Sequence, residues 1–127
     1  MALSSSKVSE VKREVRSTFD FISSDYDKLR GRIWEDLIEF TTDCLQLSKR
    51  KRDETILDLA CGNARHAIYF AEKYQFRGIA LDFSTQLLKL AKRRIKTSKQ
   101  EHMIALINGD ASRIPLRCQS VDATLYI

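Results

Sequence analysis

The sequence predicts an α/β fold with a doubly wound, mainly parallel sheet, preceded by a helical N-terminal segment. Short apolar runs alternate with helical patterns of about 10–15 residues after position 54, as parallel βαβ units require. Before that position, apolar residues recur only at helical spacing and proline is absent. We therefore expect residues 1–54 to form a helical segment and residues 55–127 to form the sheet domain.

The N-terminal segment is expected to hold two helices. Apolar residues step by three or four positions along its first part, at Val8, Val11, Val15, Phe19 and Ile22. A second helical stretch runs from Ile33 to about residue 48. The Ser-Ser-Asp sequence at 23–25 separates the two, because these side chains compete with helical hydrogen bonds and cap the next helix. The polar run at 48–54 is a hinge to the second half.

Four strands and two helices are expected after the hinge. The strands are predicted at residues 55–60, 76–83, 102–109 and 121–127, and the helices at 64–74 and 84–98. The first of these helices is expected to face the sheet with Ala67, Ile68, Phe70 and Ala71. The second begins at Ser84, which is a favourable cap.

Composition limits the class of protein. No stretch approaches the roughly 20 apolar residues of a membrane span, and the N-terminus lacks the apolar region of a secretory signal. Neither a membrane partner nor export is therefore expected. The 3 cysteines form no CxxC pair, so they fit reduced thiols in a cytoplasmic protein and no metal site. The net charge of +5 permits an anionic partner such as RNA without requiring one.

The loop after the first strand, DLACGNAR at 58–65, is the first candidate for a binding site. In a doubly wound sheet, ligands bind outside the carboxyl ends of the strands, near the switch in strand order. The small residues Ala60, Gly62 and Ala64 let the backbone approach a ligand closely. A tight strand-to-helix turn without a ligand is the alternative for this loop.

Two further acids favour a ligand. Asp82 ends the second strand 20 residues after Gly62, the spacing at which a carboxylate reaches ribose hydroxyls in nucleotide-binding units. Asp110 follows the third strand, so together with Asp58 it gives three acids at the same end of successive strands. Phe83 is a candidate platform for an adenine ring, with an ordinary core residue as the alternative.

The same loop disfavours a nicotinamide cofactor. Such a cofactor prefers a G-x-G-x-x-G loop, whose glycines let backbone amides meet the pyrophosphate, and the spacing here does not match it. We therefore expect a nucleoside cofactor that lacks a pyrophosphate.

Four motifs, taken in order, resemble those of class I S-adenosylmethionine-dependent methyltransferases. They are DLACGNARH, the acid of GIALDFS, GDASRIPL and VDATLYI. The resemblance covers about residues 55–127 and implies a Rossmann-like fold with S-adenosyl-L-methionine as the cofactor. The first motif of that family usually reads D-x-G-x-G-x-G, and this chain has Ala60 and Ala64 at the first and third glycine positions.

The resemblance implies roles for individual residues. The methionine and ribose portion of the cofactor would be lined by Asp58, Ala60, Cys61, Gly62, Asn63 and Ala64. Asp82 would hydrogen-bond the ribose hydroxyls, and Asp110 with the backbone of Ala111 would bind the adenine amino group. The sulfonium activates its own methyl group, so the main tasks left to the protein are positioning and orientation.

The segment STFDFISSDYDKLRGRIW at 17–34 resembles the N-terminal part of tRNA wobble-uridine methyltransferases, where a Tyr-Asp pair precedes an Arg and a Trp. Tyr26, Asp27, Arg30 and Trp34 take those positions. Arg30 would pair with the cofactor's carboxylate, with a solvated helix-end charge as the alternative. This resemblance implies tRNA as the acceptor, while a small-molecule acceptor stays open.

By the same resemblance, the chain would hold roughly the first half of a seven-stranded domain, with the third strand at an edge and the fourth beside the first. Residues of the acceptor site would then follow position 127, so no catalytic residue is assigned. The wobble-uridine family docks a small zinc-ribbon activator protein at the third-strand edge, which implies such a partner here. A non-catalytic module that docks a partner through this edge is the other open interpretation.

Overall fold

The computed structural model describes residues 4–26, 28, 35–46 and 49–127. The N-terminal part contains helix α1 (Ser5–Ile22), the short 3-10 helix η1 (Ser23–Asp25) and helix α3 (Glu35–Cys44). The second part contains strands β1 (Thr55–Leu59), β2 (Arg77–Asp82), β3 (Ile104–Asn108) and β4 (Ala123–Leu125), with helices α4 (Arg65–Tyr74) and α5 (Thr85–Thr97) connecting the first three strands.

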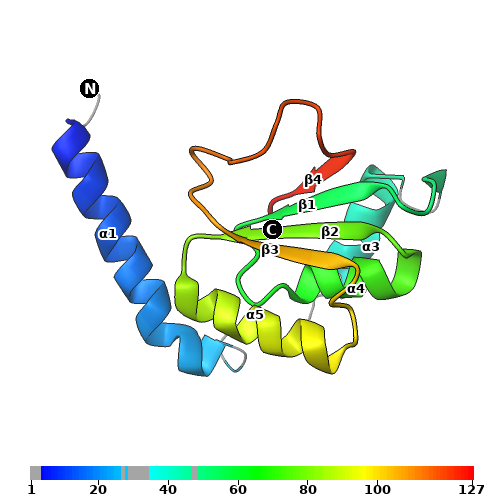
Figure 1. Ribbon diagram of the computed structural model, residues 1–127, viewed down its shortest axis with the longest axis horizontal. Coiled ribbons are helices and arrows are strands. Elements are labelled where there is room, and N and C mark those ends of the chain that lie inside the picture. Colours follow the sequence, from blue (N-terminus) through cyan, green and yellow to red (C-terminus); the bar gives the residue numbers. More distant parts are fainter. Residues whose placement is uncertain (1–3, 27, 29–34, 47–48) are drawn as a thin grey trace.

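The strands form one parallel sheet in the order β3-β2-β1-β4. The chain moves outward from β1 to β3 and then returns to place β4 on the other side of β1, so the strand order switches at β1. All strands run in the same direction, and their carboxyl ends point toward α1 (Figure 1). The predicted α/β fold is thereby confirmed, with the third strand at an edge and the fourth beside the first.

Two elements are shorter than the sequence predicted. The second N-terminal helix ends at Cys44 and not near residue 48, because the chain turns at Gln46, whose backbone is left-handed (φ 49°). The last strand begins at Ala123 and not at residue 121. The preceding Asp122 uses its side chain to accept a hydrogen bond of 2.7 Å from the backbone N–H of Thr55, which ties β4 to the start of β1.

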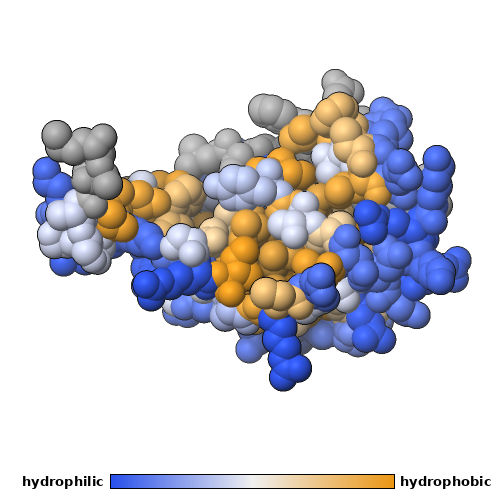
Figure 2. Space-filling model, turned by 90° about the horizontal axis from the view of Figure 1, so that it is seen from above, coloured by the Kyte–Doolittle hydropathy of each residue, from blue (hydrophilic) through white to orange (hydrophobic). Residues whose placement is uncertain are grey.

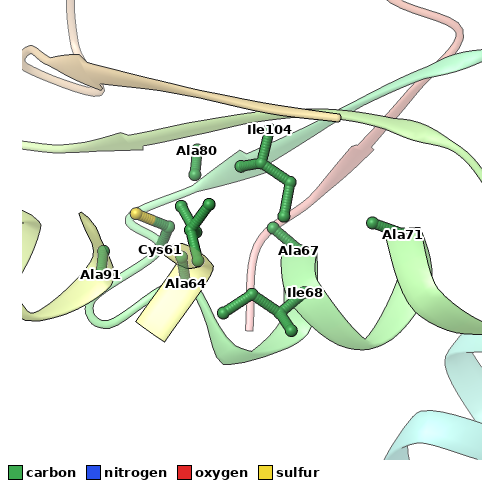
Figure 3. Close-up of a cluster of buried hydrophobic side chains, with 9 residues drawn as sticks. Cys61, Ala64, Ala67, Ile68, Ala71, Ala80, Ala91 and Ile104 are labelled. Atoms are coloured by element: carbon green, nitrogen blue, oxygen red, sulfur yellow. The ribbon is translucent and has the colours of Figure 1, made fainter. Parts of the chain in front are cut away.

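The main core lies between the sheet and helices α4 and α5, which cover the same face (Figure 1). It is rich in small side chains, since the buried cluster includes Ala64, Ala67, Ala71, Ala80 and Ala91. Figure 3 shows Ala67 and Ala71 of α4 directly under the strands. Small residues let a helix approach a sheet closely. The expected inward residues of α4 are all buried. This packing fixes the first turn of α4 against the loop that follows β1.

The two N-terminal helices pack against different parts of the molecule. Ile38 of α3 joins a second core cluster with Ile56, Phe70, Phe76 and Leu125. Helix α1 has no buried residue and contacts α5 and η1, beyond the carboxyl ends of the strands (Figure 1). The helical periodicity predicted for α1 is confirmed, but of its apolar side only Phe19 and Ile22 are partly buried. Within the described ranges, no helix combines the length and apolar character needed to cross a bilayer.

Candidate functional site

A cavity of about 480 Å³ lies where the strands end. Each strand contributes to its wall: Ala60 follows β1, Asp82 and Phe83 end β2, Gly109, Asp110 and Ala111 follow β3, and Tyr126 and Ile127 follow β4. The N-terminal part adds Val15, Phe19 and Tyr26. Most of this lining is apolar, with two carboxylates set into it. The cavity occupies the position at which ligands bind in open α/β sheets.

The loop after β1 has an alternating left-handed backbone. Ala60, Gly62 and Ala64 have φ angles of 57°, 55° and 59°. The two alanines thus adopt, at the first and third positions of the motif, the backbone that glycine adopts at little cost. Tyr26 lies over the middle of the loop, since a Cβ atom added to Gly62 would be 2.5 Å from the Tyr26 hydroxyl. The loop is therefore compact and covered from the N-terminal side.

Asp82 joins the loops that follow β1 and β2. Its Oδ2 accepts a hydrogen bond of 2.8 Å from the backbone N–H of Gly62, and its Oδ1 accepts one of 2.9 Å from that of Ser84. Asn108 reinforces this corner from β3, because its side-chain amide donates to the carbonyls of Asp82 and Phe83 at 3.1 Å. A carboxylate oxygen can accept two hydrogen bonds, and each oxygen of Asp82 accepts one from the backbone, so Asp82 retains acceptor capacity for a hydroxyl in the cavity.

Asp58 lies beneath the loop and outside the cavity wall. Its side chain is 2% exposed and accepts a hydrogen bond of 3.1 Å from the backbone N–H of Ala67, in the first turn of α4. The pKa of Asp58 is raised to about 7, mainly by burial and in part by the charge of Asp82, against the lowering effects of the Ala67 hydrogen bond and of the charge of Arg65. Asp58 thus holds α4 against β1 and has no direct opening to the cavity.

The raised pKa of Asp58 predicts a pH-dependent stability. The unfolded pKa is about 3.9, so the folded protein holds one more proton than the unfolded chain between about pH 4 and pH 7. The free energy of unfolding should therefore fall, by roughly 2–4 kcal/mol, as the pH rises through that range. In Asp58→Asn this contribution should disappear, since an amide oxygen still accepts from Ala67. Urea denaturation at a series of pH values measures it, and parallel curves for the two proteins would contradict it.

Asp110 is engaged by α1. Its Oδ2 lies 2.5 Å from Lys12 Nζ, and its Oδ1 accepts a hydrogen bond of 2.8 Å from the backbone N–H of Ser112. Lys12 also donates to the Ser112 hydroxyl at 2.7 Å. The hydrogen bond from Lys12, and then those from Ser112, hold the pKa of Asp110 well below its usual range. Asp110 is therefore an anion at neutral pH, paired across the mouth of the cavity.

Phe83 is also contacted by α1. The ring of Phe19 meets it edge to face, with centroids 6.1 Å apart, and the guanidinium of Arg16 lies 5.6 Å from its centroid. One turn further along α1, Asp20 accepts hydrogen bonds from the Ser84 hydroxyl and, at 3.4 Å, from the backbone N–H of Gln86. Helix α1 thus contacts the ends of both β2 and β3 and forms one side of the cavity.

The predicted site residues divide into two groups. Those that line the cavity are Ala60, Asp82, Phe83, Asp110 and Ala111. Those buried around the loop are Asp58, Cys61, Gly62, Asn63 and Ala64. Burial, with the charges of Asp58 and Asp82, raises the pKa of the Cys61 thiol, so that this cysteine stays neutral. Arg30, like Asp27 and Trp34, lies outside the described residues.

Several residues of the site were missed from the sequence. Lys12, Arg16 and Phe19 contact predicted site residues from α1, and Asn108 fixes the corner at Asp82. For Phe19 the signal was present, because it belongs to the apolar stripe of α1. The Lys12–Asp110 pair joins residues 98 positions apart, which no local pattern reveals.

Comparison of the sequence with known proteins assigns the chain to a protein family. The sequence model of the family described as "Methyltransferase domain" matches residues 56–127. The demethylmenaquinone methyltransferase of Listeria welshimeri is 30% identical over 119 residues, which cover 91% of this chain and 50% of the relative. The chain thus spans about half the length of the curated relatives that it matches.

Solved structures share the fold. The S-adenosylmethionine-dependent methyltransferase of Thiobacillus denitrificans, in complex with S-adenosylhomocysteine, has a TM-score of 0.65 at 21% identity over 82% of this chain and 41% of that one. A putative methyltransferase of Haloferax volcanii, in complex with a Trm112 activator, has a TM-score of 0.61 at 24% identity over 84% of this chain and 45% of its own.

These comparisons do not support the tRNA acceptor expected from segment 17–34. The curated relative carries the name of a quinone methyltransferase. Of the four residues that suggested the wobble-uridine group, only Tyr26 lies in the described part of the chain, where it covers Gly62. The coarser resemblance, to the methyltransferase domain, is confirmed.

Proposed function

Because the chain belongs to the family of methyltransferase domains, we propose that its cavity binds S-adenosylmethionine and that the protein methylates an apolar small molecule of the quinone class. One observation carries the proposal. The ends of all four strands bring Asp82, Asp110, Phe83 and the small Ala60 to one largely apolar cavity of about 480 Å³. A nucleoside cofactor needs acceptors for its hydroxyls and amino group, and a flat apolar surface for its base.

The residues present fit this cofactor. Asp82 has remaining acceptor capacity toward the cavity and is held in place by Gly62 and Ser84. Phe83 offers an aromatic ring on the same wall, and Asp110 is a carboxylate one strand further along. A volume of about 480 Å³ lies in the range of about 300–1,000 Å³ that holds ligands of this size. A solved structure of the same fold supports the assignment, since it is a complex with S-adenosylhomocysteine.

The chemistry asked of this chain is positioning. S-adenosylmethionine supplies a methyl group already activated by its sulfonium, so a base is not needed to create the leaving group. The compact loop from Ala60 to Ala64 and the fixed carboxylate of Asp82 would hold the nucleoside in one orientation. Apolar walls exclude water from the transfer, and the main contribution of the protein is the alignment of the two reactants.

An apolar acceptor is supported by the side of the cavity that α1 forms. Val15 and Phe19 line it together with Leu87, Tyr126 and Ile127, and none of these side chains carries a charge. The name of the Listeria relative, a demethylmenaquinone methyltransferase, points to the same class of acceptor.

Methyl transfer from radiolabelled S-adenosylmethionine tests the acceptor. The protein is offered a reduced naphthoquinone with an isoprenoid tail, and separately bulk tRNA. We expect label in the organic extract of the first reaction and none in precipitated RNA. Label in RNA alone would contradict the acceptor but not the cofactor. A protein that binds no S-adenosylhomocysteine in a calorimetric titration would contradict both.

A protein partner at the open edge of β3 is a second proposal. Within the described residues β3 pairs with β2 alone, and Ala105 on it is exposed. The Haloferax neighbour, solved with a Trm112 activator, supports the idea that such a domain can take a protein partner. Co-elution of the protein with a purified Trm112-type zinc protein, reduced in Ala105→Lys, is the expected result. Independent elution of the two proteins would contradict it.

A further inference from the structure

An exposed apolar ridge borders the mouth of the cavity. Val8, Val11 and Val15 are 37%, 48% and 39% exposed and recur at the spacing that places them along one side of α1. Ile114, in the loop between β3 and β4, is 39% exposed. Val15 also lines the cavity, so the ridge continues into it. Scattered exposed apolar residues are ordinary, but exposed apolar residues gathered beside an apolar pocket mark an interaction site.

The two parts of this border are held together. Lys12 of α1 contacts both Asp110 and Ser112, at the start of the loop that carries Ile114. Figure 2 shows hydrophobic side chains along the arm formed by α1 and again over the middle of the same face, with hydrophilic residues around them. We call Val8, Val11, Val15 and Ile114 the apolar rim.

Cations flank the apolar rim. Lys7 on α1 and Arg113 and Arg117 on the loop are exposed. Residues 111–121 contain no acid. On α1, helical spacing places Glu10 away from the valines, whereas Glu14 is three residues after Val11 and lies on the same flank of the helix as Lys7. The remaining acid of the region, Asp110, is paired with Lys12. The three cations outnumber Glu14, so the rim combines apolar side chains with a border of net positive charge.

We propose that the apolar rim docks the protein on an anionic lipid surface, with the cavity mouth toward the bilayer. The inference rests on the proposed function, since an acceptor with an isoprenoid tail resides in the bilayer. Apolar side chains flanked by Lys and Arg are the composition that binds the interface of anionic membranes. A second copy of the chain fits poorly, because two rims face to face would bring their cations together. Such docking needs no spanning helix, which was the basis for expecting no membrane partner.

Vesicle sedimentation with the full protein tests the proposal. The probes are vesicles of pure phosphatidylcholine and of phosphatidylcholine mixed with phosphatidylglycerol. We expect binding to the mixed vesicles, weakened by salt, and little binding to the neutral ones. The double variant Arg113→Gln/Arg117→Gln should weaken binding to mixed vesicles about 25-fold, since each cation near such a surface contributes about 1 kcal/mol, or about fivefold.

The apolar part is tested with a matched pair of variants. Val11→Asp places a charge on the rim, at a residue that does not line the cavity, and should weaken vesicle binding at least about tenfold. Ser17→Asp adds the same charge to an exposed residue on the opposite side of α1 and should leave binding unchanged. Both variants should retain the wild-type affinity for S-adenosylhomocysteine, which shows that they are folded.

Three outcomes would overturn the docking proposal: no binding to mixed vesicles, equal binding by the Val11→Asp and Ser17→Asp variants, or a dimer in solution that Val11→Asp dissociates. The last would assign the rim to a second copy. Failure of the proposed function is separate, because it would appear as vesicle binding without methyl transfer to the naphthoquinol. If the unsubstituted protein binds no vesicles but still methylates a short-tailed, water-soluble naphthoquinol, the docking alone is contradicted.

Discussion

Replacing Asp82 by alanine is expected to lower the free energy of unfolding by about 3 kcal/mol and the affinity for S-adenosylhomocysteine by about 100-fold or more. The first effect arises because the buried carboxylate accepts from the backbone N–H groups of Gly62 and Ser84, and hydrogen bonds to charged groups contribute about 1.5–3 kcal/mol each. The second follows from the loss of the acceptor proposed for the ribose hydroxyls, since 100-fold corresponds to about 2.7 kcal/mol. Urea denaturation and calorimetric titration measure the two effects.

A matched control separates folding from binding in this prediction. Asp122 also accepts a hydrogen bond from a backbone N–H, that of Thr55, but at the opposite end of the sheet. Asp122→Ala should cost about 1 kcal/mol of stability and leave the affinity for S-adenosylhomocysteine unchanged. The titrations are made at a temperature at which circular dichroism shows both variants folded. Equal affinity in the Asp82→Ala and Asp122→Ala variants would remove Asp82 from the site.

Gly62→Ala is expected to destabilise the protein by about 2–4 kcal/mol. An alanine at this left-handed position (φ 55°) costs about 1–2 kcal/mol, and its Cβ atom would lie 2.5 Å from the hydroxyl of Tyr26 and 3.0 Å from its ring carbon Cζ. Either the loop or Tyr26 must move. A shift of the loop also disturbs the hydrogen bond that the backbone N–H of residue 62 donates to Asp82. Denaturation curves measure the loss, and an unchanged midpoint would show that Tyr26 does not cover the loop.

The contact with Tyr26 gives this prediction a double-mutant cycle. The combined Gly62→Ala and Tyr26→Phe variant should be less destabilised than the sum of the single variants, because the nearest clashing atom has been removed. Ala60→Gly is the matched control in the same loop. Ala60 is exposed with φ 57°, so glycine there should raise stability by about 0.5 kcal/mol. A strict sum in the cycle would contradict the contact between Tyr26 and Gly62.

The sheet and its acids could be predicted because each rests on a local pattern. A run of apolar residues that ends in an acid marks the carboxyl end of a buried strand, and in a parallel sheet such ends meet at one edge. Asp82 and Asp110 therefore lie beside the same cavity, as their positions in the sequence suggested. The spacing from Gly62 to Asp82 corresponds to a direct hydrogen bond between the two residues.

The position of each side chain relative to the cavity could not be predicted in the same way. Side chains along β1 point alternately to the two faces of the sheet. The side chain of Asp58 points toward α4, where it accepts a hydrogen bond from the backbone N–H of Ala67. Left-handed φ angles at Ala60 and Ala64 are set by the tight connection from strand to helix and leave no mark in the residue types. The pairing of Lys12 with Asp110 depends on the docking of α1, which is a tertiary property.

The N-terminal helix shows a further limit of pattern reasoning. Its apolar stripe predicted a helix correctly, but periodicity does not say what covers the apolar side. Only Phe19 and Ile22 of that stripe become partly buried, whereas Val8, Val11 and Val15 stay exposed beside the cavity. The same valines that define the helix in the sequence thus form the apolar rim in the structure.

A crystal structure of the protein with S-adenosylhomocysteine is the most direct test of the proposed cofactor site. We expect the ribose hydroxyls within hydrogen-bond distance of the Asp82 carboxylate and the base against Phe83, with Gly62 still donating to Asp82. A ligand bound away from the ends of β1 and β2, or crystals that remain free of it at saturating concentration, would contradict the account.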